Sequence, residues 1–145
     1  MNELVVKLLG WVVANAPYAE PPEPPSLEYK SADAFVQETC PSGINCAAGA
    51  YYLDGSNAIV LHESFENSTE VQHRGLVVHE LVHYLQDISG KFEGGKTCDM
   101  WLAREREAFA VQLKFLFRET GDVFFLYRTP SLTRKQCEQF EIPAK

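Results

Sequence analysis

The sequence lacks several features that would each indicate a particular class of protein. No apolar run reaches the roughly 18 residues that a membrane-spanning helix needs, so we expect no membrane span. Lys and Arg together number 13 against 20 Asp and Glu, and the net charge of −7 argues against a nucleic-acid partner. No Cys-x-x-Cys pair is present, which excludes zinc-ribbon spacing, and no segment repeats.

The composition is that of a folded globular chain. Of the 145 residues, 46% are hydrophobic and 12% aromatic, so we expect one domain over residues 1–145 with a real core. Segment 1–16 is apolar but contains Glu3 and Lys7, and we interpret it as an amphipathic helix of that domain rather than a signal peptide. If the protein is exported, we expect its signal to lie outside this sequence.

The four cysteines are an even number, which favours disulfides. We expect the pairs Cys40–Cys46 and Cys98–Cys137, because the residues between the first two favour a tight turn. Disulfides persist in oxidising compartments, so this interpretation favours a secreted or periplasmic protein over a cytoplasmic one. The alternative is four buried free thiols in a cytosolic protein.

Apolar periodicity and turn residues predict an α+β fold, with a small sheet or hairpin packed on two long helices. The helix over 70–89, with Ser68 or Thr69 as its cap and Gly90 as its end, is apolar around most of its circumference. We therefore expect it to be the central buried helix. The predicted elements are helices over 3–16, from Ser31, over 70–89, over 99–119 and over 133–140, and strands over 26–30, 49–53 and 57–62.

The central helix contains the run His79-Glu80-Leu81-Val82-His83. Residues four apart lie one above the other on a helix, so the imidazoles of His79 and His83 can reach one tetrahedral metal ion. Glu80 projects about 100° around the helix from His79, which places it beside the metal-bound water as a proton acceptor. The alternative is that both histidines bond to backbone groups within a buried helix.

A third metal ligand is expected because catalytic zinc sites have three protein ligands. On the helix over 99–119, Glu105 lies at the centre of the face that must be buried, whereas Glu107 lies on the opposite, solvated face. A carboxylate within an apolar face is unfavourable unless it is paired or bound to metal. Glu105 is therefore the predicted ligand and Glu107 the second candidate. The other interpretation is a salt bridge from Glu105 to Arg104 or to another buried Arg.

Two glutamines lie on the same helix faces as these candidate ligands. Gln86 lies near His79 and His83, and Gln112 lies near Glu105. Either glutamine can support a metal ligand through a hydrogen bond. Both can equally form a polar seam between two buried helices, and the sequence favours neither interpretation.

The HExxH run, followed by Glu105-Arg106-Glu107-Ala108, resembles the Glu-zincin (gluzincin) class of zinc metallopeptidases, and most closely small bacterial proteins of minimal zincin type. The resemblance covers about residues 50–117. It implies a zincin-like fold with Glu105, three residues before Ala, as the third ligand, and strand 57–62 as the substrate-facing edge strand. Phe109 occupies the position where larger members have a supporting Asp.

Residues and resemblance together predict a zinc-dependent metallopeptidase that acts on a peptide or protein. Zn2+ bound by His79, His83 and Glu105 would lower the pKa of its water, and Glu80 would be the general base. The alternative is a secreted, non-catalytic interaction protein that keeps zinc structurally. The sequence does not rank the side chains that would stabilise an oxyanion, which are Tyr51, Tyr52, His62, His73 and Tyr127.

Overall fold

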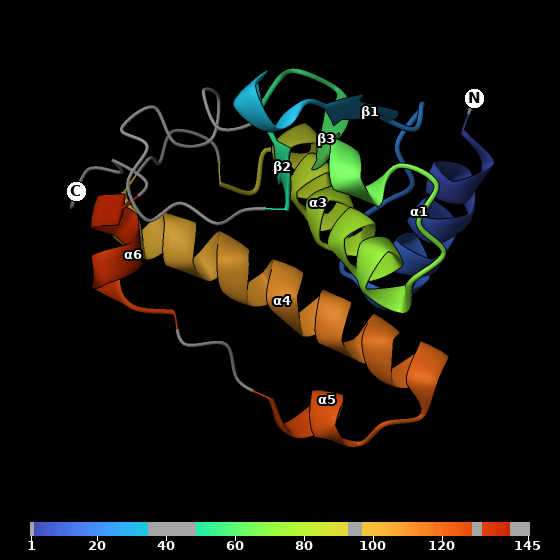
Figure 1. Ribbon diagram of the computed structural model, residues 1–145. Coiled ribbons are helices and arrows are strands. Elements are labelled where there is room, and N and C mark those ends of the chain that lie inside the picture. Colours follow the sequence, from blue (N-terminus) through green and yellow to red (C-terminus); the bar gives the residue numbers. More distant parts are fainter. Residues whose placement is uncertain (1, 35–48, 93–96, 129–131, 140–145) are drawn as a thin grey trace.

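A computed structural model of the chain describes residues 2–34, 49–92, 97–128 and 132–139. The predicted α+β fold is confirmed: a three-stranded mixed sheet packs against helices (Figure 1). The predicted pair Cys40–Cys46 lies outside the described residues. The elements in chain order are α1 (Glu3–Asn15), β1 (Ser26–Lys30), β2 (Ala50–Tyr52), β3 (Ala58–His62), the short 3-10 helix η1 (Glu63–Phe65), α3 (Val71–Ser89), α4 (Cys98–Thr120), α5 (Phe124–Tyr127) and α6 (Arg134–Gln139).

The sheet has the strand order β1-β3-β2. The predicted hairpin is confirmed, since β2 and β3 are antiparallel with Ala50 opposite Leu61. The prediction that strand 57–62 is the edge strand is wrong, because β1 pairs parallel to β3 on its other side, with Ser26 opposite Ala58. A hairpin alone does not reveal a third strand from a distant part of the chain. Among the described residues β2 pairs with β3 alone, so β2 is an edge strand.

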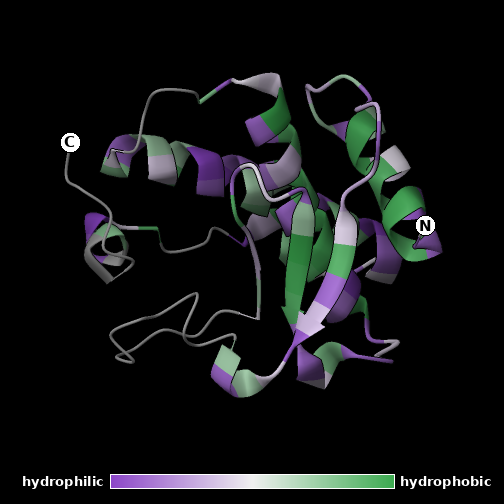
Figure 2. Cartoon of the chain, turned by 90° about the horizontal axis from the view of Figure 1, so that it is seen from above, coloured by the Kyte–Doolittle hydropathy of each residue, from purple (hydrophilic) through white to green (hydrophobic). Residues whose placement is uncertain are grey.

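Burial does not follow the strand order, since all three residues of the edge strand β2 are buried. The interior residues of β3 are buried, and Figure 2 shows its ribbon mainly in the colour of hydrophobic residues. β1 alternates between hydrophobic and hydrophilic colours in the same view, and its residues are only partly buried or exposed. A continuous apolar run is typical of a strand covered on both faces, which is the position that β3 occupies.

Helix α3 lies between the sheet and α4 (Figure 1) and packs against α1, α4, β2 and β3. The prediction of a central buried helix is confirmed, and Gly90 ends it in the left-handed conformation with φ 71°. The predicted cap is wrong: Glu70 occupies the N-cap position without a side-chain bond, and the hydroxyl of Ser68 accepts from the Glu70 amide instead.

Small residues bring α3 and α4 close together. A Cβ atom at Gly75 would lie 3.0 Å from Leu116 Cδ2, so a larger side chain there would push α4 away. Ala108 on α4 is fully buried at 0% exposure. This close approach allows side chains of the two helices to meet at a common site.

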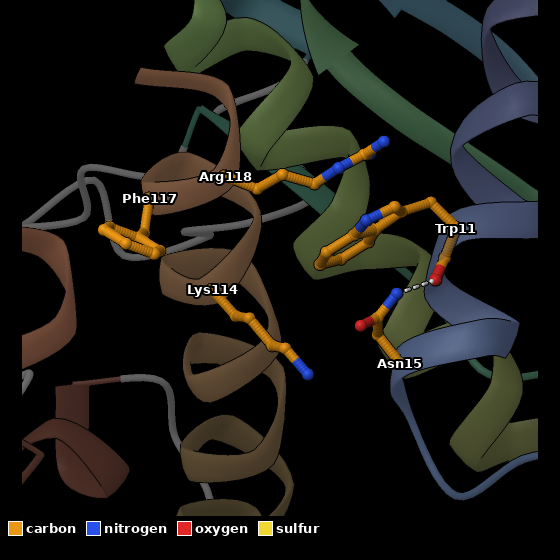
Figure 3. Close-up of a pocket in the computed structure, with 5 residues that line it drawn as sticks. All are labelled: Trp11, Asn15, Lys114, Phe117 and Arg118. Atoms are coloured by element: carbon orange, nitrogen blue, oxygen red, sulfur yellow. Dashed lines mark hydrogen bonds between the residues drawn. The ribbon is translucent and has the colours of Figure 1, made fainter. Parts of the chain in front are cut away.

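Helix α1 packs on α3 and reaches α4 through Trp11, whose ring meets the Phe115 ring edge-on at 5.3 Å. The Arg118 guanidinium lies over the Trp11 ring, 5.9 Å from its centre. Figure 3 shows a pocket at this junction, with Asn15 Nδ2 donating to the Trp11 carbonyl. The pocket is lined by Trp11, Asn15, Lys114, Phe117 and Arg118. These contacts fix α1 against the outer part of α4.

The predicted disulfide Cys98–Cys137 is confirmed, with the two Cα atoms 5.5 Å apart. Both cysteines are buried with Leu102 in a small apolar cluster that Trp101 and Leu132 extend. The bond therefore joins the start of α4 to α6. Within the described ranges, no helix has both the length and the apolar character required to cross a membrane.

Candidate metal centre

Three side chains from α3 and α4 converge on one point. His79 Nε2 lies 3.2 Å from His83 Nε2 and 3.0 Å from Glu105 Oε2, and His83 Nε2 lies 3.0 Å from Glu105 Oε1. The structure thus brings together the three residues predicted as metal ligands, in a group that could hold a metal ion.

The helices place these atoms for simple geometric reasons. His79 and His83 are one turn apart on α3, and their rings meet edge-on at 4.9 Å. Glu105 projects from the α4 face that contains Ala108, and its side chain is 17% exposed. Ligands 2.0–2.1 Å from a tetrahedral zinc ion are about 3.3 Å apart. The observed separations are close to that value, so a small outward movement would admit the ion.

Hydrogen bonds on the far side of each ring fix which nitrogen faces the centre. Gln112 Oε1 lies 2.9 Å from His79 Nδ1, and Gln86 Oε1 lies 2.8 Å from His83 Nδ1. An amide oxygen only accepts, so each Nδ1 donates to its glutamine and each Nε2 faces the Glu105 carboxylate. Without a metal, an Nε2 that carries a proton donates it to Glu105. Once that proton leaves, the lone pair of the nitrogen is free to bind a metal ion, and the three side chains form a group that could hold one.

Glu105 is ionised in this environment. Burial alone would raise the pKa of its carboxyl group, but hydrogen bonds from His79 and His83 outweigh burial and hold the pKa well below its usual range. The carboxylate is therefore available as an anionic ligand throughout the physiological pH range.

Glu80 follows the candidate ligand His79 in the sequence and is 6% exposed. Burial raises the pKa of its carboxyl group to about 7, against lowering contributions that include His79 and a hydrogen bond from the Tyr52 backbone amide. The charge of Glu105 adds to the raising effect of burial within this value. Glu80 thus interacts with the triad and with the edge strand β2, and it can hold or release a proton near neutral pH.

The other carboxylate candidate on α4, Glu107, is not part of the triad. The prediction that Glu107 lies on a solvated face is wrong, because its side chain is only 20% exposed. Its carboxylate accepts from Lys91 Nζ at 2.6 Å, from Gln86 Nε2 at 3.0 Å and from the Tyr18 hydroxyl. Lys91 and Tyr18 come from outside α4, so a helical projection of α4 does not show them.

The contacts of Gln86 and Gln112 fit both interpretations of the sequence. Each glutamine accepts a hydrogen bond from one histidine of the triad, and each links α3 to α4, since Gln86 also donates to Arg104 and Glu107 and Gln112 reaches His79 from α4. Phe109 packs edge-on against the His79 ring at 4.5 Å.

The predicted alternative of a salt bridge between Arg104 and Glu105 is not observed. Arg104 forms two bonds to Asp54, of 3.1 and 2.8 Å. Sequence reasoning missed this pair, because Asp54 lies in the hairpin turn and only the folded chain brings it to α4.

The candidate oxyanion donors have partners elsewhere or stay unassigned. The Tyr52 hydroxyl donates to Asp87 at 2.6 Å, His62 contacts Ser64 at 2.8 Å, and His73 contacts both Tyr29 and Ser68. Tyr127 is 83% exposed on α5, and Tyr51 is buried against Val60. The structure therefore adds no support for any of these residues as an oxyanion donor.

No family model, no curated protein and no solved structure matches this chain. The likeness to Glu-zincins therefore rests on the HExxH run and the buried triad alone.

Proposed function

We propose that the protein is a zinc-dependent peptidase. The observation that supports this function is the convergence of His79, His83 and Glu105, with the ionisable Glu80 on the same helix. A purely structural zinc site needs only the ligands. It has no use for a buried carboxyl group whose pKa lies near 7, which is the value expected of a general base at neutral pH.

Each residue has a distinct role in the proposed reaction. His79, His83 and Glu105 would hold the zinc ion, which when bound supplies Lewis-acid chemistry by polarising a carbonyl group and acidifying water. Glu80 would accept a proton from the attacking water and pass it to the leaving amine. Gln86 and Gln112 would keep the imidazole rings oriented for binding.

The proposed substrate is an extended peptide or protein segment. The expectation that strand 57–62 binds it does not fit the central position of β3, so we assign this role to β2. The Tyr52 amide of β2 points to Glu80 rather than to β3, so the edge of β2 opposite β3 lies toward the proposed site. A strand edge can pair with a substrate backbone by β-addition.

The disulfide Cys98–Cys137 is consistent with a protein that folds in an oxidising compartment. We therefore propose a secreted or periplasmic location. In that setting the substrate would be an extracytoplasmic peptide or protein.

The deciding experiment compares zinc-loaded wild type with Glu80→Gln on a peptide library. We expect turnover to fall at least about 100-fold, the lower limit for losing a general base, while zinc content is unchanged. The matched control is Glu119→Gln, an exposed carboxylate of α4 whose ion pair with Arg74 is 3.7 Å long.

Two results would oppose this proposal. Turnover retained in Glu80→Gln would reject the assigned role of Glu80. A zinc-loaded wild type without turnover and without an exchangeable water on the metal would instead indicate a structural zinc site in a binding protein.

A further inference from the structure

Gln86 is a buried glutamine, 1% exposed, in contact with a proposed metal ligand. We infer that Gln86, held by Glu107 and Arg104, is a positioning residue that keeps His83 with Nε2 toward the metal. This inference rests on the proposed zinc site and extends it. It gives Glu107, the second candidate after Glu105 for the third metal ligand, an indirect role in metal binding.

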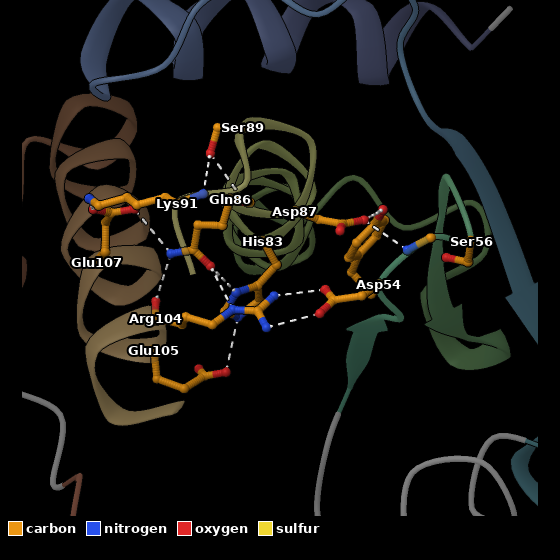
Figure 4. A network of polar contacts seen from close by, with 12 residues as sticks. Asp54, Ser56, His83, Gln86, Asp87, Ser89, Lys91, Arg104, Glu105 and Glu107 are labelled. Atoms are coloured by element: carbon orange, nitrogen blue, oxygen red, sulfur yellow. Dashed lines mark hydrogen bonds and ion pairs between the residues drawn. The ribbon is translucent and has the colours of Figure 1, made fainter. Parts of the chain in front are cut away.

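The Gln86 amide has a partner for each of its hydrogen-bonding positions. Its Nε2 donates to the Arg104 carbonyl at 3.1 Å and to Glu107 Oε1 at 3.0 Å. Its Oε1 lies 3.3 Å from Arg104 Nε and 2.8 Å from His83 Nδ1 (Figure 4). Two donors and two acceptors are thus satisfied at once.

These partners determine the orientation of the amide. The carbonyl of Arg104 and the carboxylate of Glu107 only accept, so they must face the amide NH2 group. The guanidinium of Arg104 only donates, so it must face the amide oxygen. With the oxygen fixed, His83 Nδ1 has to carry the proton that it shares with Gln86. The lone pair of a neutral His83 ring is then on Nε2, toward His79 and Glu105.

The groups around Gln86 are themselves anchored by distant parts of the chain. Glu107 accepts from Lys91 and from the Tyr18 hydroxyl, and Arg104 forms its two bonds to Asp54 in the hairpin turn. Figure 4 shows Gln86 between Glu107 and Arg104, with the Glu105 carboxylate on the His83 side. The orientation of one metal ligand is therefore linked to contacts outside both helices.

The second histidine provides an internal comparison. Among the described residues, the Gln112 side chain forms one hydrogen bond, and its partner is His79. No carboxylate faces that amide among these residues. The same change from glutamine to glutamate should therefore have opposite effects at the two positions.

The test measures zinc affinity by competition with a chromophoric chelator, and the imidazole tautomers by 1H–15N correlation spectra. Gln86→Met keeps an unbranched side chain without the amide and should weaken zinc binding about 10- to 100-fold. Its His83 ring should sample both tautomers, whereas the wild-type ring carries its proton on Nδ1. Glu107→Gln, which is nearer the surface, should weaken zinc binding less.

Charge reversal provides the sharper readout. Gln86→Glu places a carboxylate against both Glu107 and the Arg104 carbonyl and should weaken zinc binding. Adding Glu107→Gln to it should restore part of the loss, by returning a donor to one of these two contacts. Gln112→Glu should tighten zinc binding, because a carboxylate is a stronger acceptor for the His79 proton. General damage to folding would not produce this pattern of rescue.

Unchanged zinc affinity in Gln86→Met, or no rescue in the double variant, would overturn the inference while the zinc site stands. Equal weakening by both glutamine-to-glutamate changes would assign the effect to added charge and also overturn it. A wild type that binds no zinc would reject the proposed function instead. The tautomer of His83 in the wild-type protein tests the inference even if the protein binds no zinc or if Gln86→Met fails to fold. A His83 proton on Nε2 instead of Nδ1 would contradict the inference.

Discussion

The two sides of α3 differ in what they contribute to the protein. The side toward the apolar core carries Val77, Leu81 and Leu85, which are at most 2% exposed. The side toward α4 carries His79, His83 and Gln86, which are nearly as well buried but polar. The first side provides stability by removing apolar surface from water. The side toward α4 buries polar groups, which stabilise a core less than apolar groups do. Their presence in a buried position therefore indicates a function.

The comparison shows why burial alone does not identify a core. Both sides of α3 exclude water to a similar degree, yet the buried polar groups of His79, His83 and Gln86 all have hydrogen-bond partners. When no metal is bound, we expect the polar side of α3 to make the folded protein less stable than an apolar side of the same size would. We therefore expect changes on the two sides to separate stability from metal binding.

The largest effect on stability is expected on the apolar side. Leu81→Ala removes a side chain that is 0% exposed and should lower the free energy of unfolding by about 2–5 kcal/mol. Chemical denaturation measures this loss. Because Leu81 points away from the triad, zinc affinity of the folded protein should stay unchanged, and a parallel loss of zinc affinity would contradict the separation of the two sides.

The disulfide at the start of α4 should have the next largest effect. Replacing both Cys98 and Cys137 by Ser opens a loop with a sequence separation of 39 residues and should lower the free energy of unfolding by about 2–4 kcal/mol. Thermal denaturation of the two proteins without reductant tests this value. Equal stability would show that α6 does not depend on its covalent link to α4.

On the polar side, Glu80 should make the zinc-free protein less stable as pH rises. Its pKa of about 7 lies above the ordinary value of 4.5, so the folded chain holds this proton more tightly than the unfolded chain. The contribution is complete below pH 4.5 and is lost as pH rises toward and through 7. It amounts to roughly 3 kcal/mol at about 1.4 kcal/mol per pKa unit.

Comparison with Glu80→Gln isolates this contribution, because the amide does not titrate. Relative to the variant, the zinc-free wild type should lose stability between pH 5 and pH 8 in denaturant titrations. A constant difference in stability between the two proteins over that range would contradict the raised pKa. Increased stability together with lost turnover would identify Glu80 as a residue kept for chemistry rather than for folding.

Local patterns in the sequence predicted much of this structure. The HExxH spacing and the buried helical face of Glu105 depend on residues within one or two turns, so periodicity alone selected three residues whose side chains converge in the structure. Cys98 was correctly paired with Cys137, but by elimination, after the turn residues between Cys40 and Cys46 had suggested the first pair. The helical patterns, unlike the disulfide, need no information about the rest of the chain.

The features that were not predicted from the sequence depend on contacts between distant segments of the chain. β3 is central because β1 pairs with it from the other side, and Glu107 is covered by Tyr18 and Lys91. Asp54 reaches Arg104 only when the hairpin folds against α4. No periodicity within one element encodes these contacts, so the strand order and the support of His83 became visible only in the structure.

The most direct test of the metal centre is the zinc content of the purified protein after equilibrium dialysis, measured for wild type, Glu105→Gln and the exposed control Glu119→Gln. We predict about one zinc ion per chain in wild type and control, because three protein ligands define one site. Glu105→Gln should lose more affinity than the roughly 10- to 100-fold expected for a supporting residue. Wild type without zinc, or equal zinc content in all three proteins, would contradict the site.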